Sequence, residues 1–312
     1  MKILMYGAGG IGGYFGAKLA KAGNEVTIYA RGVHLKVIQK SGINVKSIHG
    51  DFRAKPKLAT DDLSKLEPPD LILLGVKSWQ IPSIAKTLKP ILDKNTMILP
   101  LQNGASNVEM LLKELPEENV LSGLCLIVSY ISAPGEITHA GHEPKIIFGE
   151  KDNSRTQRVL DLSEVFTKAK ISNLIPEDIT LEIWKKFLFI TTISALGGLT
   201  RVPLGKMRES EYLREVILST GKEIIAVANA KNIKLTPQHL DLVMETISNL
   251  KPETTASTQR DIMEGKPSEL ENFNGYIIKE GKRLGVPTPV NQFIYECLLP
   301  MEKQARIQLE TN

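Results

Sequence analysis

The stretch that decides the fold of the N-terminal half is Lys2-Ile3-Leu4-Met5-Tyr6-Gly7-Ala8-Gly9-Gly10-Ile11-Gly12. An apolar run typical of a buried strand leads into the pattern G-x-G-x-x-G, and a segment with helical apolar spacing, 11–22, follows. In this setting Gly7 permits a tight turn, Gly9 lets the backbone approach a pyrophosphate, and Gly12 lets helix and strand pack closely. The alternative is a purely structural glycine-rich turn. The strand–turn–helix frame favours dinucleotide binding by Gly7, Ala8, Gly9, Gly10, Ile11 and Gly12.

The end of the next predicted strand, 25–30, bears on the choice between NAD and NADP. A site selective for NAD usually has Asp or Glu there, about 20 residues after the glycines, to bind the ribose hydroxyls. This position reads Ile28-Tyr29-Ala30-Arg31 and has no carboxylate. Arg31 could bind a 2′-phosphate through two hydrogen bonds, so we predict NADP(H) as the cofactor. A solvated arginine at the start of a loop would leave the missing carboxylate unexplained.

The first half of the chain alternates strand-like and helix-like segments, which predicts an α/β domain with a mostly parallel sheet. The predicted strands are 3–6, 25–30, 71–77, 96–101 and 120–130, and the predicted helices are 11–22, 79–88 and 106–115. Segments 135–139 and 145–149 are predicted to form an appended antiparallel pair, because the three residues His142-Glu143-Pro144 are too few for a crossover.

From about Glu177 the strand patterns disappear and long amphipathic patterns follow, at 178–198, 209–230, 236–250 and 268–284. The sequence therefore predicts two domains. Residues 1–174 form a Rossmann-type α/β domain, and residues 175–312 form an all-helical domain.

Composition excludes several classes of protein. The formal net charge of +4 is too small to indicate nucleic acid binding, although residues 1–100 carry 15 basic side chains against 7 acidic ones. The longest uncharged run, 119–135, is too short and too polar to span a membrane. Cys125 and Cys297 are predicted to be buried thiols rather than a disulfide. None of the five histidines is given a catalytic or metal role, so no metal is predicted, and the chain is interpreted as cytoplasmic.

Two adjacent lysines interrupt an apolar helix pattern at residues 181–190. Lys185 and Lys186 point about 100° apart on a helix, so both cannot easily reach bulk water. A partly desolvated lysine can donate a proton near neutral pH. Periodicity does not choose between the two residues, and both stems could instead extend to the surface.

Five blocks along the chain share their order and spacing with a known family. They are Gly7–Gly12 with Arg31; Gly75-Val76-Lys77-Ser78-Trp79-Gln80; Gln102-Asn103-Gly104; Trp184 with Lys186; and Ser257, Asp261-Ile262, Gly265-Lys266-Pro267-Ser268-Glu269, Asn274-Gly275 and Gly285-Val286-Pro287-Thr288-Pro289. On these blocks nearly the whole chain resembles the ketopantoate reductases (2-dehydropantoate 2-reductases). The resemblance implies a Rossmann domain joined to a helical domain like that of 6-phosphogluconate dehydrogenase, with the active site in the cleft between them.

The resemblance also implies an activity and a set of residue roles. The family reduces the 2-oxo group of ketopantoate with NADPH, giving pantoate for pantothenate and coenzyme A synthesis. Lys186 matches the family's proton donor, and Glu269 matches the acidic residue that contacts substrate and cofactor and orients the lysine. Ser257 matches a substrate-binding hydroxyl, and Lys77 and Asn103 match residues that line the nicotinamide and the substrate. Three of these residues also have a purely structural interpretation. Lys77 could be a solvated loop lysine, Asn103 a turn former before Gly104, and Glu269 a surface glutamate.

One departure concerns the substrate. The family usually carries asparagines four and eight residues after the lysine, where this chain has Ile190 and Ser194. Ser194 keeps a substrate-binding hydroxyl and Ile190 has none, although Thr191 or Ser194 could compensate. Three hypotheses follow: a ketopantoate reductase, a reductase of another 2-oxoacid, and a catalytically silent NADP-sensing protein. A homodimer is possible.

Overall fold

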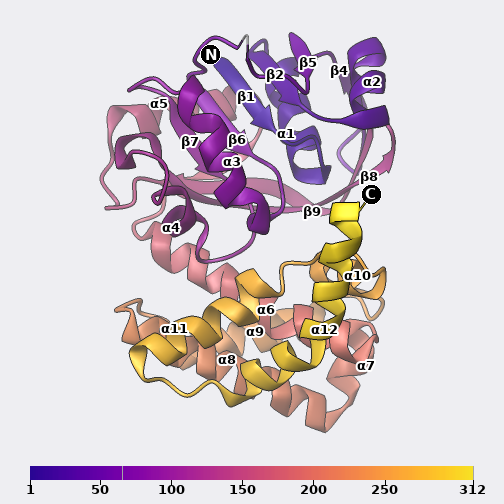
Figure 1. The fold of residues 1–312 in the computed structure, drawn as a ribbon, viewed down its shortest axis with the longest axis vertical. Helices are drawn as coiled ribbons and strands as arrows, with labels where there is room; N and C mark the ends of the chain where they lie inside the picture. Colours follow the sequence, from indigo (N-terminus) through magenta and orange to yellow (C-terminus); the bar gives the residue numbers. More distant parts are fainter. Residues whose placement is uncertain (65, 312) are drawn as a thin grey trace. The chain divides into compact units, whose positions relative to one another are not determined.

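The structure is a computed structural model that describes residues 1–64 and 66–311. The chain folds into two compact units (Figure 1). The first contains Met1–Gln102 and Asn107–Ile179, and the second contains Asn103–Ser106 and the chain from Thr180 onward. The predicted division after residue 174 precedes the observed one, and the short segment Asn103–Ser106 was not foreseen. A hydrogen bond from Ile179 N to Asn153 Oδ1 (2.9 Å) holds the first residue of the first long helix to the α/β unit.

The centre of the first unit is a parallel sheet of five strands in the spatial order β5-β2-β1-β6-β7. Its strands are β1 (Lys2–Tyr6), β2 (Glu25–Tyr29), β5 (Leu58–Thr60), β6 (Leu71–Leu74) and β7 (Met97–Pro100). The unit's helices are α1 (Gly10–Lys21), α2 (Gly32–Ser41), η1 (Ser78–Gln80), α3 (Ile81–Leu88), η2 (Lys89–Ile91), α4 (Asn107–Leu111), η3 (Glu117–Asn119) and α5 (Gln157–Lys168). The parallel sheet is confirmed, although strand β5 and helices α2 and α5 were not predicted.

Alternating side chains of β1 belong to two different cores, because successive residues of a strand point to opposite faces. Ile3 and Met5 pack in the core that contains α1 residues such as Phe15. Leu4 and Tyr6 pack in a second core with the apolar face of α3. Both faces of the sheet are covered, which explains why its strands are apolar throughout.

A second sheet was misread from the sequence. It has the order β10-β9-β3-β4, with β8 pairing β9, and comprises β3 (Ile43–Ser47), β4 (Phe52–Ala54), β8 (Ser122–Ala133), β9 (Glu136–Gly149) and β10 (Ser172–Leu174). The predicted pairing of 135–139 with 145–149 is wrong, because both segments belong to β9 and pair antiparallel with β8.

The error has a local cause at a bulge in β9. Ala140 pairs with Val128 and Lys145 pairs with Leu126, so four residues, 141–144, lie opposite Ile127 alone. Pro144 has no N–H to donate to a ladder, and such a residue is accommodated at a bulge. A bulge of this kind resembles a hairpin turn when only one strand is visible in the sequence.

His139 closes this bulge through both of its ring nitrogens. Its Nδ1 is 2.8 Å from Ser47 Oγ and its Nε2 is 3.0 Å from His142 O. The ring is buried, and burial lowers the pKa of His139. His139 therefore helps to hold the second sheet together at the bulge.

The second unit is helical. Its elements are α6 (Ile179–Thr200), α7 (Leu204–Glu209), α8 (Glu211–Ala230), α9 (Pro237–Asn249), α10 (Ser257–Met263), the π-helical turn η4 (Glu271–Gly275), α11 (Tyr276–Leu284) and α12 (Pro289–Thr311). The four predicted helices are present, with 209–230 observed as α8 and 268–284 divided between η4 and α11. Helices α7, α10 and α12 were not predicted. The all-helical class of this unit is confirmed.

Two further predictions can be compared with the structure. Cys125 is buried, but Cys297 is exposed, because the buried stripe of α12 runs through Asn291, Ile294 and Leu298 and leaves residue 297 on the other face. No helix in residues 1–64 and 66–311 has both the length and the apolar character needed to cross a membrane.

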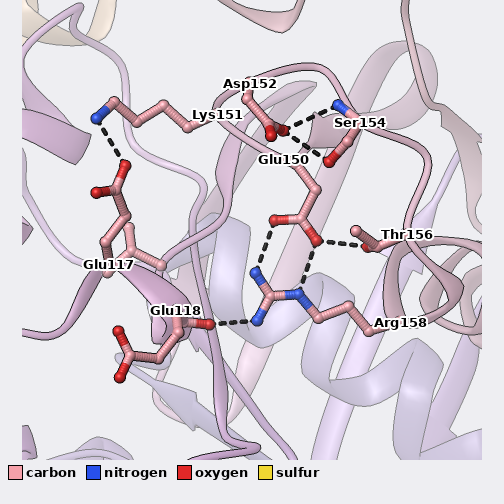
Figure 2. A pocket seen from close by; sticks show the side chains of 9 residues that line it. Glu117, Glu118, Glu150, Lys151, Asp152, Ser154, Thr156 and Arg158 are labelled. Carbon is pink, nitrogen blue, oxygen red and sulfur yellow. Dashed lines mark hydrogen bonds and ion pairs between the residues drawn. The ribbon is translucent and has the colours of Figure 1, made fainter.

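An ion pair with a buried carboxylate and a half-buried guanidinium ties the end of β9 to α5 (Figure 2). Arg158 Nη2 is 2.6 Å from Glu150 Oε2 and Arg158 Nε donates to Oε1 (2.7 Å), while Nη1 donates to Glu118 O. Thr156 Oγ1 donates to the same carboxylate (2.5 Å). Burial opposes ionisation of Glu150, but these hydrogen bonds outweigh it and lower the pKa of the carboxyl below its ordinary value.

We expect Glu150→Gln to lower the free energy of unfolding by about 3 kcal/mol at pH 7, because it leaves the Arg158 charge without its counter-ion. A carboxyl with a lowered folded pKa contributes fully above its unfolded pKa of about 4.3, and the contribution is lost as pH falls through the folded value. The gap between wild type and variant should therefore narrow below pH ~4 in urea unfolding curves. Glu117→Gln removes an exposed ion pair with Lys151, which lies near Glu150 in Figure 2, and is the control, with a loss of at most about 1 kcal/mol. A pH-independent gap would contradict the assignment.

Candidate functional site

The turn from β1 into α1 is built by Gly7 and its neighbours. Gly7 adopts φ +101°, a conformation that L side chains rarely adopt, and its N–H donates to Tyr29 O (3.1 Å). A Cβ at this position would lie 2.8 Å from Val76 Cγ1. The turn therefore requires glycine for both its conformation and its packing.

The other three glycines differ in what surrounds them. A Cβ at Gly12 would lie 1.9 Å from Gly7 O, and one at Gly10 would lie 2.3 Å from Ser129 O of β8. Both positions therefore require glycine, because the backbone of another segment lies in direct contact with each of them. At Gly9 the nearest atom to a Cβ would be Gly75 O at 3.7 Å. The protein itself would accept a side chain at Gly9, so the space there is open to a ligand.

A hollow of about 500 Å³ adjoins this loop. It is lined by Tyr6, Gly7, Ala8, Gly9, Tyr29, Ala30, Arg31, His34, Val76, Gln80, Ser83, Ile84, Thr87 and Ile131. No side chain caps the N-terminus of α1 and its first turn has no acidic residue. The first N–H groups of a helix have no preceding carbonyl group within the helix to bind, so those of α1 can bind phosphate oxygens.

Arg31 reaches the hollow on an aromatic support. The rings of Tyr6 and Tyr29 stack with centroids 4.3 Å apart, and the guanidinium of Arg31 donates to Tyr29 Oη (3.0 Å from Nη2). Burial and the neighbouring Tyr29 raise the pKa of Tyr6 to about 12, and the hydrogen bond to Tyr29 raises that of Arg31. The exposed guanidinium is thereby held at the end of β2, with donors left for an anion. The loop, the hollow and Arg31 together fit a dinucleotide with its phosphate groups.

His34 is a residue of this hollow that the sequence did not single out. Gly135 N donates to His34 Nδ1 (3.0 Å), so Nε2 carries the proton and donates to Ala8 O (2.9 Å). Burial lowers the pKa of His34, against the effect of the bond to Ala8. The neutral ring therefore joins α2, the glycine loop and the β8–β9 turn. Its partners lie 26 and 101 residues away, and no local pattern signals them.

Lys77 and Asn103 follow two neighbouring strands of the parallel sheet, where open α/β sheets bind ligands. Lys77 comes three residues after β6, is half-buried, and donates its N–H to Gln80 Oε1 (3.1 Å). Asn103 comes three residues after β7, is also half-buried, and belongs to the second unit. Gly104 has φ +120°, so the Asn103-Gly104 pair also marks a bend.

Gln102, beside Asn103, is a second residue that was quoted in a motif but given no role. It is only 3% exposed, and neither of its amide atoms has a hydrogen-bond partner in the described part of the chain. A buried amide without partners is unfavourable by about 1–3 kcal/mol. Such a group at the carboxyl edge of the sheet is a further candidate for contact with a ligand or an ordered water.

On α6 the two adjacent lysines, Lys185 and Lys186, are both half-buried. Lys185 Nζ is 2.6 Å from Glu182 Oε1, three residues earlier on the same helix. This ion pair assigns Lys185 a structural partner on its own helix. The signal was present in the sequence, since residues three apart face each other on a helix.

Aromatic contacts join the turn of α6 that carries Lys186 to the segment after Glu269. Phe187 packs against Phe273 and Tyr276, each with ring centroids 6.1 Å apart, and Trp184 lies 6.2 Å from Tyr276. Glu269 itself is 4% exposed, so the reading of a surface glutamate is wrong. The turn of α6 that carries Lys186 and the segment after Glu269 thus share one aromatic cluster within the helical unit.

Helix α10, which begins at Ser257, packs on the other end of α6. A Cβ at Gly197 would lie 2.6 Å from Gln259 Oε1, and one at Gly198 would lie 2.6 Å from Ile262 Cδ1. Glycine at both positions allows the helices to approach closely. Ser257 is exposed, whereas Ser194 is buried at 2% exposure. Asn103, Lys186, Ser194, Ser257 and Glu269 all belong to the second unit, and the glycine loop, Arg31 and Lys77 belong to the first.

A glycine loop at the edge of a parallel sheet, followed by a helical unit of this kind, is typical of the dinucleotide-dependent oxidoreductases. Comparison with known proteins narrows this class. Residues 3–153 match the family described as Ketopantoate reductase PanE/ApbA, and residues 178–302 match Ketopantoate reductase PanE/ApbA C terminal. The chain belongs to the ketopantoate reductase family and is an oxidoreductase.

Individual relatives cover almost the whole chain. The chain is 30% identical to the uncharacterized oxidoreductase YkpB of Bacillus subtilis, over 97% of this chain and 100% of the relative. It is 29% identical to a 2-dehydropantoate 2-reductase of Pyrococcus abyssi, over 95% and 96%. Among solved structures, a PanE/ApbA family ketopantoate reductase from Ralstonia eutropha has a TM-score of 0.89 at 29% identity, over 98% and 100%.

Gly9→Ala and Gly12→Ala should separate ligand binding from folding. At Gly12 the new methyl group would meet the Gly7 backbone, so we expect the free energy of unfolding to fall by about 3 kcal/mol. At Gly9 the methyl group fits the protein and should change stability by less than about 1 kcal/mol, yet weaken nicotinamide dinucleotide binding at least about tenfold. Urea unfolding and fluorescence titration measure the two effects. Unchanged affinity in Gly9→Ala would refute the placement of the pyrophosphate.

Proposed function

We propose that the chain reduces the 2-oxo group of ketopantoate to the hydroxyl of pantoate, with NADPH as the reductant. The observation that carries the proposal is the aromatic cluster that joins the turn of α6 bearing Lys186 to the segment after Glu269, while Lys185 is paired with Glu182. Membership of the family, and relatives named 2-dehydropantoate 2-reductase, support the substrate.

The chain's own residues would supply position and a proton. When bound, the reduced nicotinamide supplies the hydride. The carbonyl oxygen of the substrate gains negative charge as its carbon is reduced, and the Lys186 ammonium stabilises that charge and donates the proton. Glu269 and the hydroxyl of Ser257 would bind the substrate hydroxyl and fix its orientation. Asn103 and Lys77 would contact substrate and nicotinamide.

Arg31 supports NADP(H) over NAD(H) in this proposal. Its guanidinium is exposed beside the glycine-loop hollow and is braced by Tyr29, so it is preorganised for a 2′-phosphate. No carboxylate stands at the end of β2 to bind free ribose hydroxyls. The neighbouring charge of Asp61 also acts on Arg31, and a bound phosphate would have to compete with it.

A second candidate, the reduction of another 2-oxoacid, is favoured by Ile190. This residue replaces an asparagine of the family pattern and packs partly buried against the helical core, where it offers no hydrogen bond. Thr191 is buried and its hydroxyl has no partner among the described residues, so it could supply the missing polar contact. A bulkier or less polar 2-oxoacid would also suit the side chain of Ile190.

The predictions of a cytoplasmic location and a possible homodimer stay predictions.

The experiment that decides the function is an NADPH oxidation assay with ketopantoate beside a panel of branched and aromatic 2-oxoacids. We expect the highest kcat/KM with ketopantoate. Strong turnover of a different acid with negligible ketopantoate turnover would establish the second candidate. Tight NADPH binding without turnover of any acid would establish an NADP-sensing protein.

In the same assay, Lys186→Ala and Lys185→Ala form a matched pair. Loss of the proton donor should lower kcat about 1000-fold while cofactor affinity stays within about twofold of wild type. Lys185→Ala removes only a partly exposed ion pair, worth about 0.5 kcal/mol of stability, and should keep near-normal turnover. Equal losses in both variants would argue against Lys186 as the reacting lysine.

Arg31→Asp tests cofactor choice by fluorescence titration. Removal of charge-assisted hydrogen bonds should weaken NADPH binding at least about tenfold, and the new carboxylate should repel the 2′-phosphate. NADH lacks that phosphate, so its affinity should change much less. Equal weakening of the two cofactors would mean that Arg31 does not select NADPH.

A further inference from the structure

The residue before Glu269 is bound more completely than packing requires. Ser268 N lies 3.1 Å from both carboxylate oxygens of Glu302, and Ser268 Oγ donates to Glu302 Oε2 (2.5 Å). The same Oγ accepts from Leu270 N (3.2 Å). These contacts fix the backbone on both sides of Glu269.

Arg306 completes this arrangement from the next turn of α12. Its Nη2 donates to Ser268 O (3.0 Å) and lies 2.7 Å from Glu302 Oε1. Every polar group of Ser268 therefore has a partner, and α12 supplies all but one. We call Glu302 and Arg306 the α12 clamp.

The clamp is largely buried, and burial of charged groups is unfavourable unless they are paired and hydrogen-bonded. The side chain of Glu302 is 6% exposed and that of Arg306 is 32% exposed. Replacing a buried ion pair by apolar residues of similar size is often neutral or stabilising, so stability alone is a weak reason for one. An arrangement that fixes one backbone position is a better explanation here.

The chain after Glu269 is also unusual. Residues Glu271–Gly275 form a π-helical turn, with Gly275 N donating to Leu270 O (3.1 Å). Such turns are rare and occur frequently at functional sites. The clamp thus holds Ser268, the residue just before Glu269, shortly before the π-helical turn begins.

We infer that Glu302 and Arg306 are positioning residues that set the place of the Glu269 carboxylate, an inference that rests on the proposed reductase function. They act through Ser268 and the backbone, without touching the reactants themselves. A displacement of about 1 Å in a catalytic group can reduce turnover about 100-fold. A carboxylate that must bind a substrate hydroxyl and orient a lysine requires such a support.

The helical unit offers a matched control for a merely structural role. Glu280 on α11 has 8% side-chain exposure and pairs with Lys231 and Arg283, each at 2.7 Å. It is as buried as Glu302 and is also held by an arginine, but it ties α8 to α11 rather than to the Glu269 segment. Lys231 also lies over the ring of Tyr276 (5.5 Å to the centroid), but none of the partners of Glu280 binds the backbone at Ser268. Loss of Glu280 therefore reports the effect of a broken buried ion pair without loss of the Ser268 contacts.

The test compares Glu302→Gln with Glu280→Gln in the NADPH-dependent reduction of ketopantoate. We expect kcat/KM to fall about tenfold in Glu302→Gln and less than about twofold in Glu280→Gln at comparable loss of stability. In a Glu269→Gln background, Glu302→Gln should cause no further loss, because it acts through the residue already removed. If Glu302→Gln does not fold, Arg306→Lys replaces it in the test. This variant keeps the charge beside Glu302 but lacks the planar guanidinium, so its loss of kcat/KM should lie between those expected for Glu280→Gln and Glu302→Gln.

Equal losses from Glu302→Gln and Glu280→Gln, or an effect of Glu302→Gln that adds fully to that of Glu269→Gln, would overturn the inference. Amide hydrogen exchange across residues 269–271 provides a readout without turnover. It should be faster in Glu302→Gln than in Glu280→Gln, and equal exchange in the two variants would also overturn the inference. If the wild type reduces no 2-oxoacid, the proposed function fails, and the exchange data alone decide whether the clamp sets the Glu269 backbone.

Discussion

The contact of Gly12 with the backbone of Gly7 is the constraint on which the first unit depends. Gly75, just after β6, completes it, since a Cβ there would lie 3.0 Å from Gly12 Cα. With no side chain at these positions, α1 starts directly against two neighbouring strands. The first-turn amides of α1 are then directed at the edge of the sheet, where a phosphate can bind. Packing of the unit and binding of the ligand thus have one cause.

Features with a local cause could be predicted from the sequence. The glycine pattern, the strands on either side of it and the long apolar helix α6 are each set by neighbouring residues. The β8–β9 pairing could not be predicted, because Pro144 and the four-residue bulge look like a turn unless Ile127 is known to lie opposite. Residues Asn103–Ser106 were likewise assigned by position in the chain, whereas tertiary contacts place them with the helical unit.

The same distinction applies to the candidate site. The ion pair of Lys185 with Glu182 could have been predicted from the sequence, since Glu182 precedes Lys185 by three residues on a helix. His34 and Glu302 had no such signal. One depends on Ala8 and Gly135, the other on Ser268 at a separation of 34 residues. Residues that hold a reacting group in place are therefore harder to predict than the group itself.

The excess of basic residues in the first hundred positions does not by itself explain cofactor binding. Lys2 and Lys57 pair with exposed carboxylates, and Lys18 and Lys21 lie over the ring of Phe52. Charges on a solvated surface are screened within about 8 Å at physiological salt, so such lysines contribute little at a distance. Arg31 differs because Tyr29, stacked on Tyr6, fixes its guanidinium beside the hollow. The features that would select a phosphate are therefore local ones, a braced arginine and the uncapped α1 N-terminus, rather than the net charge.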